Sequence, residues 1–136
     1  MAWESFNLDQ YAHDLVLQYR DKKDALNQAY KMRVTVAYGL ERFWGEQLRL
    51  TGVKANYWKA TWEKFVEIMG NAGITIPQLK DATPSNETEK IQEVASQLWN
   101  LPPKHRKVSL AVLTQLCDNM VWWTQRYKKS GGQDVE

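Results

Sequence analysis

The segment from residue 103 to residue 128 constrains the fold most, because large apolar residues recur through it at the spacing of one helix face. Pro102 and Pro103 precede this face, and proline suits the first turn of a helix, where its missing N–H has no intrahelical partner. The pattern predicts one long helix from Pro103 to Lys128. Its apolar stripe consists of Val108, Val112, Leu116, Met120, Trp123 and Tyr127, widened by Leu110, Leu113 and Cys117.

Helical spacing also recurs in four earlier segments, three of which begin at a residue suited to capping. Asn86 and Glu89 have the spacing of a capping box, and the run Gly70-Asn71-Ala72-Gly73 suits a helix end. The four predicted helical segments cover residues 9–19, 26–48, 56–69 and 86–99, with Asp9, Asn56 and Asn86 as the predicted N-caps.

One run, residues 33–38, alternates and is β-branched like a strand, but no second run is available to pair with it. We therefore predict that it is helical. The length of 136 residues suits one domain with a real core. The predicted fold is all-α, a single domain over residues 1–129 with about five helices and one long N-terminal helix or helix pair. Residues 130–136 are predicted to be a disordered tail.

The proline-free stretch from Leu8 to Leu50 predicts a rod with a basic stripe. Each residue turns a helix by about 100°, so basic residues spaced by 11, 11 and 7 positions fall within about 40° of one line if the helix is continuous. The run at residues 21–24 is a possible bend. The alternative is an ordinary solvated helix face. The stripe contains Arg20, Lys31, Arg42 and Arg49, with Tyr38 on the same line.

The formal net charge is only +2, but its distribution is uneven. Residues 20–64 hold ten Lys or Arg against five acids, and residues 100–129 hold six against one. Residues 81–93 are acidic. Cations at the start of a helix oppose its dipole, so a basic N-terminal end of the last helix favours an anionic partner. These cations are Lys104, Arg106 and Lys107.

The residues of catalytic or metal sites do not form a recognisable pattern. Cys117 is the single cysteine, and neither it nor His13 or His105 lies at a ligand spacing from another such residue. A Gly-rich phosphate loop and a nucleophile elbow are both missing. We expect no enzyme activity, metal, cofactor or small-molecule substrate. The chain also has no signal-peptide or membrane-span pattern, which predicts a cytoplasmic protein with no membrane partner.

Seven tryptophans are an unusual number for this length, and Trp is enriched in cores and interfaces. Trp58 and Trp62 share a stripe with other apolar residues and are predicted to be core. Trp122 lies about 100° away from the apolar stripe residue Trp123, which makes it a candidate for an edge or a protein interface. Trp3 and Phe6 precede the first helix and are predicted to cover the bundle end or to dock on a neighbouring subunit.

The block Pro103-Lys104-His105-Arg106-Lys107, followed by a long apolar helix, resembles the small helical subunit of CRISPR effector complexes, which act in antiviral defence. The resemblance also covers size, helical class and charge layout. It implies a subunit that cuts nothing and contacts guide RNA, target strand or displaced strand through basic faces. The implied partners are other protein subunits and further copies of the chain. The resemblance implies RNA or DNA contacts for Arg20, Lys31, Arg42, Arg49, Lys104, Arg106 and Lys107.

Two functions therefore remain. In the first, Lys and Arg side chains replace condensed counterions along phosphates, as part of a ribonucleoprotein. In the second, the chain is a helical protein–protein adaptor whose basic residues are merely solvated. A nucleic-acid binder should gather its basic residues on one surface after folding, whereas an adaptor should show an apolar patch and scattered charge.

Overall fold

The computed structural model describes the backbone of residues 7–22, 24–80 and 82–131, and the side chains of these residues up to Lys128. Helix accounts for 77% of the described residues, and no strand occurs among them, as predicted. The elements are α1 (Leu8–Tyr19), α2 (Gln28–Thr35), the 3₁₀ helix η2 (Val36–Tyr38), α3 (Leu40–Arg49), α4 (Gly52–Asn71), α5 (Glu87–Trp99) and α6 (Pro103–Gly131).

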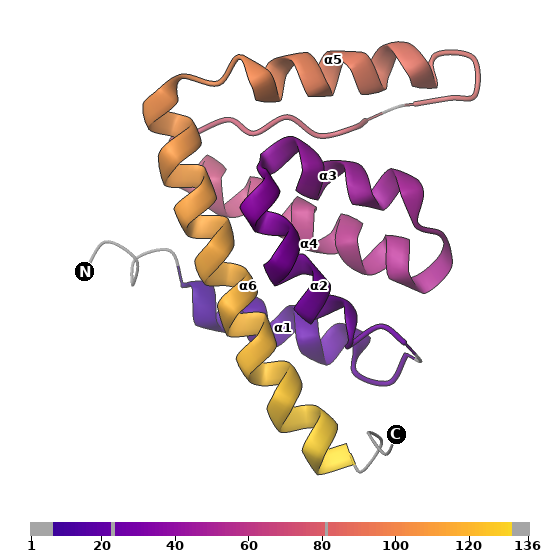
Figure 1. Ribbon diagram of the computed structural model, residues 1–136, viewed down its shortest axis with the longest axis vertical. Helices are drawn as coiled ribbons and strands as arrows, with labels where there is room; N and C mark the ends of the chain where they lie inside the picture. Colours follow the sequence, from indigo (N-terminus) through magenta and orange to yellow (C-terminus); the bar gives the residue numbers. More distant parts are fainter. Residues whose placement is uncertain (1–6, 23, 81, 132–136) are drawn as a thin grey trace.

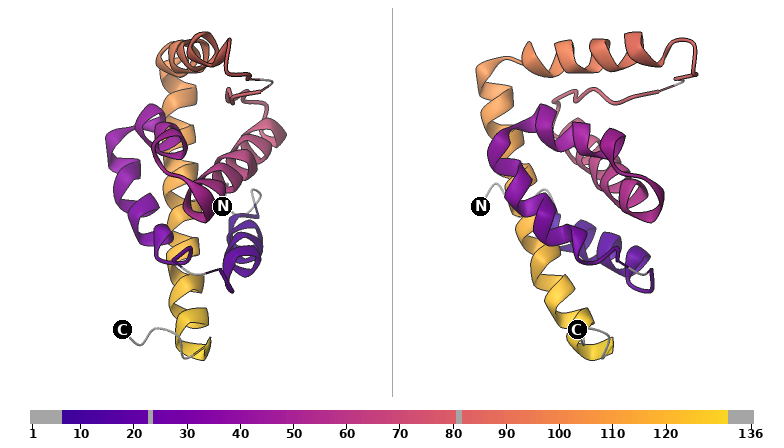
Figure 2. Two further views of the ribbon diagram at one scale, coloured as in Figure 1. Left: turned by 90° about the vertical axis from the view of Figure 1, so that its right-hand side faces the viewer. Right: turned by 45° about the vertical axis from the view of Figure 1, so that its right-hand side comes forward.

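Helix α6 is the spine of the molecule and runs along its longest axis (Figure 1). At about 1.5 Å per residue its 29 residues extend for about 43 Å. In Figure 2, α2 and α3 lie on one side of α6 and α1 and α4 on the other, while α5 crosses the top. The apolar face of α6 is thus covered from both sides. Its fully buried apolar residues are Val112, Leu113, Leu116, Cys117 and Met120.

The aromatic core joins α3 to α4. Phe43 packs against Trp58 with ring centroids 4.9 Å apart, and Trp62 packs against Phe65 at 5.2 Å. The indoles of Trp58 and Trp62 both find an acceptor, because Trp58 Nε1 donates to Gln28 Oε1 at 2.9 Å and Trp62 Nε1 donates to the Pro77 carbonyl at 3.0 Å. The prediction that Trp58 and Trp62 are core residues is confirmed.

The prediction of one long N-terminal helix or helix pair is wrong, because the helical structure is interrupted twice before Leu50. Helix α1 ends at Tyr19 and the chain turns back before Gln28, with Asp24 at a positive φ of 66°. Gly39 has a φ of 105°, which an L side chain rarely adopts, and separates η2 from α3. A continuous helix over residues 8–50 would extend for about 65 Å, too far to cover α6 from both sides.

Several helix boundaries also differ from the predicted ones. Helix α4 begins at Gly52, so Asn56 lies inside the helix instead of capping it. Helix α1 begins at Leu8, before the predicted cap Asp9, whose carboxylate accepts a hydrogen bond from Trp123. Asn86 precedes α5 as predicted, but its side chain accepts from the Thr83 amide and forms no capping box. The Asp9 and Asn86 side chains hydrogen-bond to other residues instead of capping a helix, and local sequence spacing does not reveal these partners.

The last helix starts at Pro103 as predicted and continues to Gly131. It therefore includes the first two residues of the predicted tail, Ser130 and Gly131, while residues 132–136 lie outside the described part. The strand-like run at residues 33–38 is helical, with α2 passing into η2 after Thr35. The prediction that this run is helical despite its alternating pattern is confirmed, because no partner strand occurs in the described residues.

Cys117 provides a test of the packing around α6. Its thiol is fully buried, and this burial raises its pKa, an effect to which nearby Asp118 adds and which Arg33 opposes. Because the thiolate is the reactive form, we expect iodoacetamide to label the native protein at least about a thousandfold more slowly than the urea-unfolded chain at pH 8. Raising the pH from 7 to 9 should speed labelling in both states by a similar factor, because the native protein reacts through its rare open form, in which the thiol is exposed. Equal labelling rates in the two states would contradict a closed core.

Candidate nucleic-acid interface

The structure separates the four cations of the predicted stripe. Arg20 follows the end of α1, and its guanidinium lies over the Tyr127 ring of α6, 4.9 Å from the centroid. Arg49 ends α3 and forms an ion pair with Glu46, with Nη2 and Oε1 2.6 Å apart. The hydrogen bonds to Glu46 raise the pKa of the Arg49 guanidinium. The predicted single line of cations, with Tyr38 on it, is therefore not formed, because the helix on which it depended is broken.

Arg106 has a structural role that the sequence analysis missed. Its Nη2 donates to the carbonyls of Leu98 at 2.9 Å and Trp99 at 2.6 Å, which end α5. Its Nη1 also lies 4.0 Å from Glu41 Oε1 of α3. The last carbonyls of a helix lack intrahelical partners, so the guanidinium caps α5 and ties it to α6. The sequence feature that could have indicated this role is the pair Pro102 and Pro103, because it makes α6 begin close to the end of α5.

Four of the predicted binding cations are exposed: Lys31, Arg42, Lys104 and Lys107. Within the described residues, their side chains make no ion pair, hydrogen bond or ring contact. Tyr38, at the end of η2, is 64% exposed. The elements that carry these five residues pack against one another, since α2 and η2 contact both α3 and α6. We call this set the basic face: Lys31, Tyr38, Arg42, Lys104 and Lys107.

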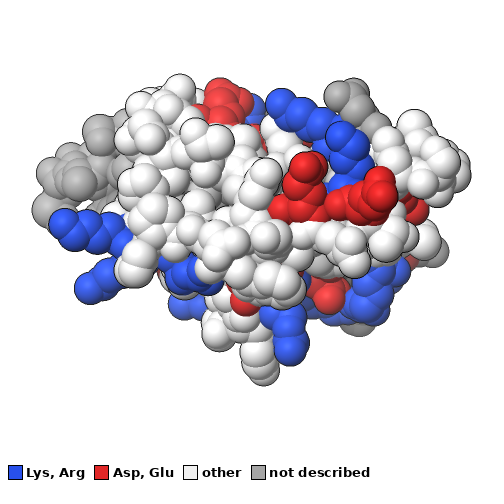
Figure 3. Space-filling view, turned by 90° about the horizontal axis from the view of Figure 1, so that it is seen from above, with Lys and Arg blue, Asp and Glu red and all other residues white. Residues whose placement is uncertain are grey.

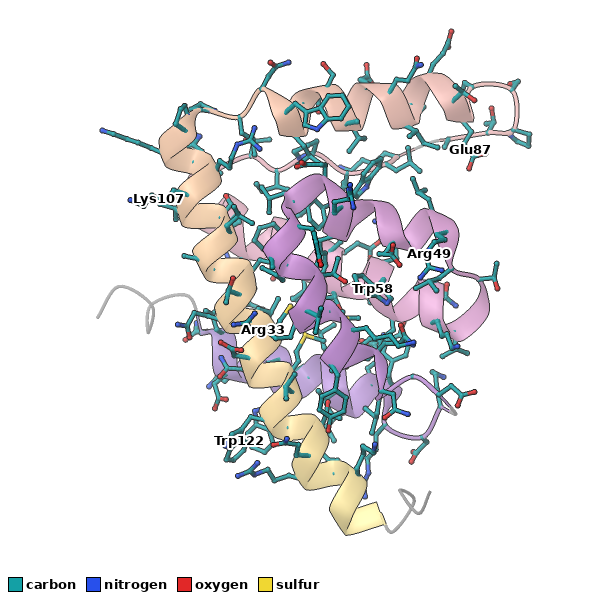
Figure 4. The ribbon with its side chains drawn as sticks, viewed as in Figure 1. Arg33, Arg49, Trp58, Glu87, Lys107 and Trp122 are labelled. Atoms are coloured by element: carbon teal, nitrogen blue, oxygen red, sulfur yellow. The ribbon has the colours of Figure 1, made fainter. Side chains whose placement is uncertain are left out.

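Charge is segregated between these elements and the rest of the chain. Residues 28–49 and 103–117 together hold seven Lys or Arg against two Glu. Helix α5 exposes three glutamates against one lysine, and Glu87 lies at its far end from α6 (Figure 4). Seen from above, Lys and Arg side chains appear at the left end and along the lower edge of the molecule, and others lie on the right, where acidic side chains are interspersed with them (Figure 3). The left end of this view is therefore basic, but Lys and Arg are not confined to one side of the molecule.

The outward side of α6 continues this basic face along the molecule. One acid interrupts it, Asp118, and its Oδ1 accepts a hydrogen bond from Arg33 Nε of α2 at 2.5 Å. Arg33 thereby neutralises the acid and holds α2 to α6. Lys107 and Trp122 project to the same side of the helix (Figure 4). We call the outer stripe of α6 the row Lys104, Lys107, Ala111, Gln115, Asp118, Trp122 and Arg126.

Aromatic and basic residues meet at the C-terminal end of the outer stripe. Trp122 is 46% exposed, which fits its predicted place at an edge, while its role in a protein interface stays a prediction. The Arg126 guanidinium lies 3.6 Å from the centroid of its ring. Trp123 packs edge-on against Trp122 and also contacts the His13 ring. Trp3 and Phe6, the other predicted interface residues, lie outside the described part of the chain.

The Arg106 cap distinguishes structural from binding cations. Replacing Arg106 with Ala leaves two carbonyls without their charged donor and should lower the free energy of unfolding by about 1–2 kcal/mol. Replacing the exposed neighbour Lys104 with Ala should change it by about 0.5 kcal/mol or less. Urea unfolding followed by circular dichroism measures both. An equal loss of unfolding free energy in the two variants would contradict a structural role of Arg106.

The chain matches no protein-family model, no curated protein and no solved structure. None of the helices in the described residues combines the length and the apolar character needed to cross a membrane. Within the same residues, no three side chains of His, Cys, Asp or Glu form a group that could hold a metal ion. A functional assignment therefore depends on the geometry of the surface.

Proposed function

We propose that the protein binds the phosphate backbone of nucleic acid through the basic face and acts as a non-catalytic subunit of a ribonucleoprotein complex. One observation carries this proposal. Four exposed cations whose side chains have no partner among the described residues lie on α2, α3 and the first turns of α6, and α2 packs against both of the other helices. The exposed Lys59 and Lys80, which also have no such partner, lie on other parts of the molecule. Cations engaged in stability, such as Arg106 and Arg33, are held by carbonyls or acids instead.

The mechanism is electrostatic and does not depend on sequence. Each Lys or Arg that approaches a phosphate releases condensed counterions, and this release supplies non-specific affinity. Four such contacts on a chain with a net charge of +2 give weak binding alone, so the protein works best when other subunits hold the nucleic acid beside it. Tyr38 lies on η2, which directly follows the helix that carries Lys31, and adds an exposed ring to the contact surface.

The resemblance to the small subunits of CRISPR effector complexes names the partner more closely. On this proposal the basic face contacts the guide–target duplex or the displaced strand, and other surfaces contact protein subunits or further copies of the chain. The all-helical fold and the size are consistent with such a subunit. Contacts with phosphates alone would suit a protein that must accept any guide.

A second candidate is the helical adaptor, which exposed apolar side chains favour. Trp99 at the end of α5 is 61% exposed, and Val34 and Val108 are also exposed. Large exposed apolar residues mark protein interfaces when they form a patch. These three lie on α5, α2 and α6, and an adaptor would use them without any need for the cations.

Removing the basic face separates the two functions. We expect Lys31, Arg42, Lys104 and Lys107, all replaced with Ala, to weaken binding to single strands and duplexes of any sequence. Each lost phosphate contact should flatten the slope of log affinity against log salt by about 0.7–0.9 units. Stability should change by about 1 kcal/mol or less, because exposed charges contribute little. Fluorescence anisotropy with labelled oligonucleotides over a series of salt concentrations measures the slope.

A control of equal charge comes from lysines on other elements. Replacing Lys22, Lys59, Lys80 and Lys90 with Ala removes four charges from outside the basic face and should leave most of the affinity in place. If the folded basic-face variant binds as the wild type does, or if both variants lose the same affinity, the proposal fails and the adaptor is favoured.

A further inference from the structure

Trp122 and Arg126 at the end of α6 form a surface that phosphate binding alone does not use. We propose that this pair is a stacking site for an unpaired base, which makes single-stranded nucleic acid the preferred ligand of the outer stripe. The inference rests on the proposed function, because it adds base stacking to the phosphate contacts of the basic face.

The indole of Trp122 is held in place before any ligand arrives. Arg126 covers it from 3.6 Å and also donates from Nη1 to the Trp122 carbonyl at 3.2 Å. Trp123 packs against it edge-on, with centroids 4.7 Å apart and an interplanar angle of 81°. Trp123 is itself fixed, because its Nε1 donates to Asp9 Oδ1 of α1 at 3.0 Å. A ring that is half exposed and already oriented can stack with little loss of conformational freedom.

The stacking pair is aligned with the cations of the outer stripe. Lys104 and Trp122 are 18 positions apart, which is five turns of an α-helix, so they share one side of α6 at a separation of about 27 Å. Asp118 lies between them and is neutralised by Arg33. A strand that follows the outer stripe therefore meets phosphate-binding lysines at one end and the aromatic pair at the other.

The chemistry of this end of α6 favours a nucleic acid over a protein ligand. Arg20 lies over Tyr127 and Lys128 over Tyr30, so two further cations with aromatic neighbours lie at the same end of α6, on other sides of the helix. Indole and guanidinium planes both stack on bases, and the guanidinium also attracts phosphate. Base faces are covered inside a duplex, so only an unpaired base can reach the indole.

The test compares three probes on the full chain. They are a single strand of about 12 nucleotides, the matching duplex and a single strand whose bases have been removed, all within the length that one small domain covers. Trp122→Ala should lower the affinity for the intact single strand by about 5- to 150-fold, the range expected from one lost stack. Trp122→Phe should restore part of it. Affinity for the duplex and the abasic strand, and the salt slope, should not change.

Trp99→Ala is the matched control, because Trp99 is also exposed but lies on α5, outside the outer stripe. It should leave the binding of all three probes unchanged. If Trp122→Ala binds the single strand as the wild type does, or weakens the duplex equally, the stacking site is excluded while the basic-face variant still tests the proposed function. A loss of protein–protein association with unchanged binding to the single strand would assign Trp122 to a protein interface and overturn the inference. If the wild type binds none of the probes, the proposed function itself fails.

Discussion

Burial of the apolar face of α6 is the interaction on which the rest of the structure depends. The helix would expose its apolar side to water if it stood alone, and most helix stability in proteins comes from packing of such a face. Helices α1 and α2 cover it from opposite sides (Figure 2). To supply both of these helices from one short stretch of chain, the protein must turn back after Tyr19. The break at Gly39 then sets the direction of α3, which packs on α4.

The turn after Tyr19 and the break at Gly39 determine where the charged residues lie. On a continuous rod, Arg20 and Arg49 would share a line with Lys31 and Arg42; in the folded chain they lie near Tyr127 and Glu46 instead. The same packing brings α2 beside α6, where Arg33 neutralises Asp118. The cations of the basic face remain without a partner among the described residues, as do Lys59 and Lys80 on other parts of the molecule. The cations of the basic face thus make no contact that the packing of the described residues requires, and they remain exposed where an anion can reach them.

The sequence predicted what depends on local periodicity. Helix α6, its start at Pro103, the helix over the strand-like run and the buried Trp58 and Trp62 could all be inferred from spacing and turn residues. The break at Gly39 could not, because a glycine inside a helical pattern is tolerated and only tertiary packing selects its positive φ here. The Arg106 cap was missed because its acceptor carbonyls are set by the turn between α5 and α6.

The central claim is that the exposed cations of α2 and α6 act together on one ligand. Lysine acetylation with and without a bound oligonucleotide, read by mass spectrometry, tests it residue by residue. We predict that Lys31, Lys104 and Lys107 are protected together, while the exposed Lys59 and Lys80 on other parts of the molecule are labelled as before. Equal protection of all five lysines, or protection of Lys59 and Lys80 alone, would contradict the account.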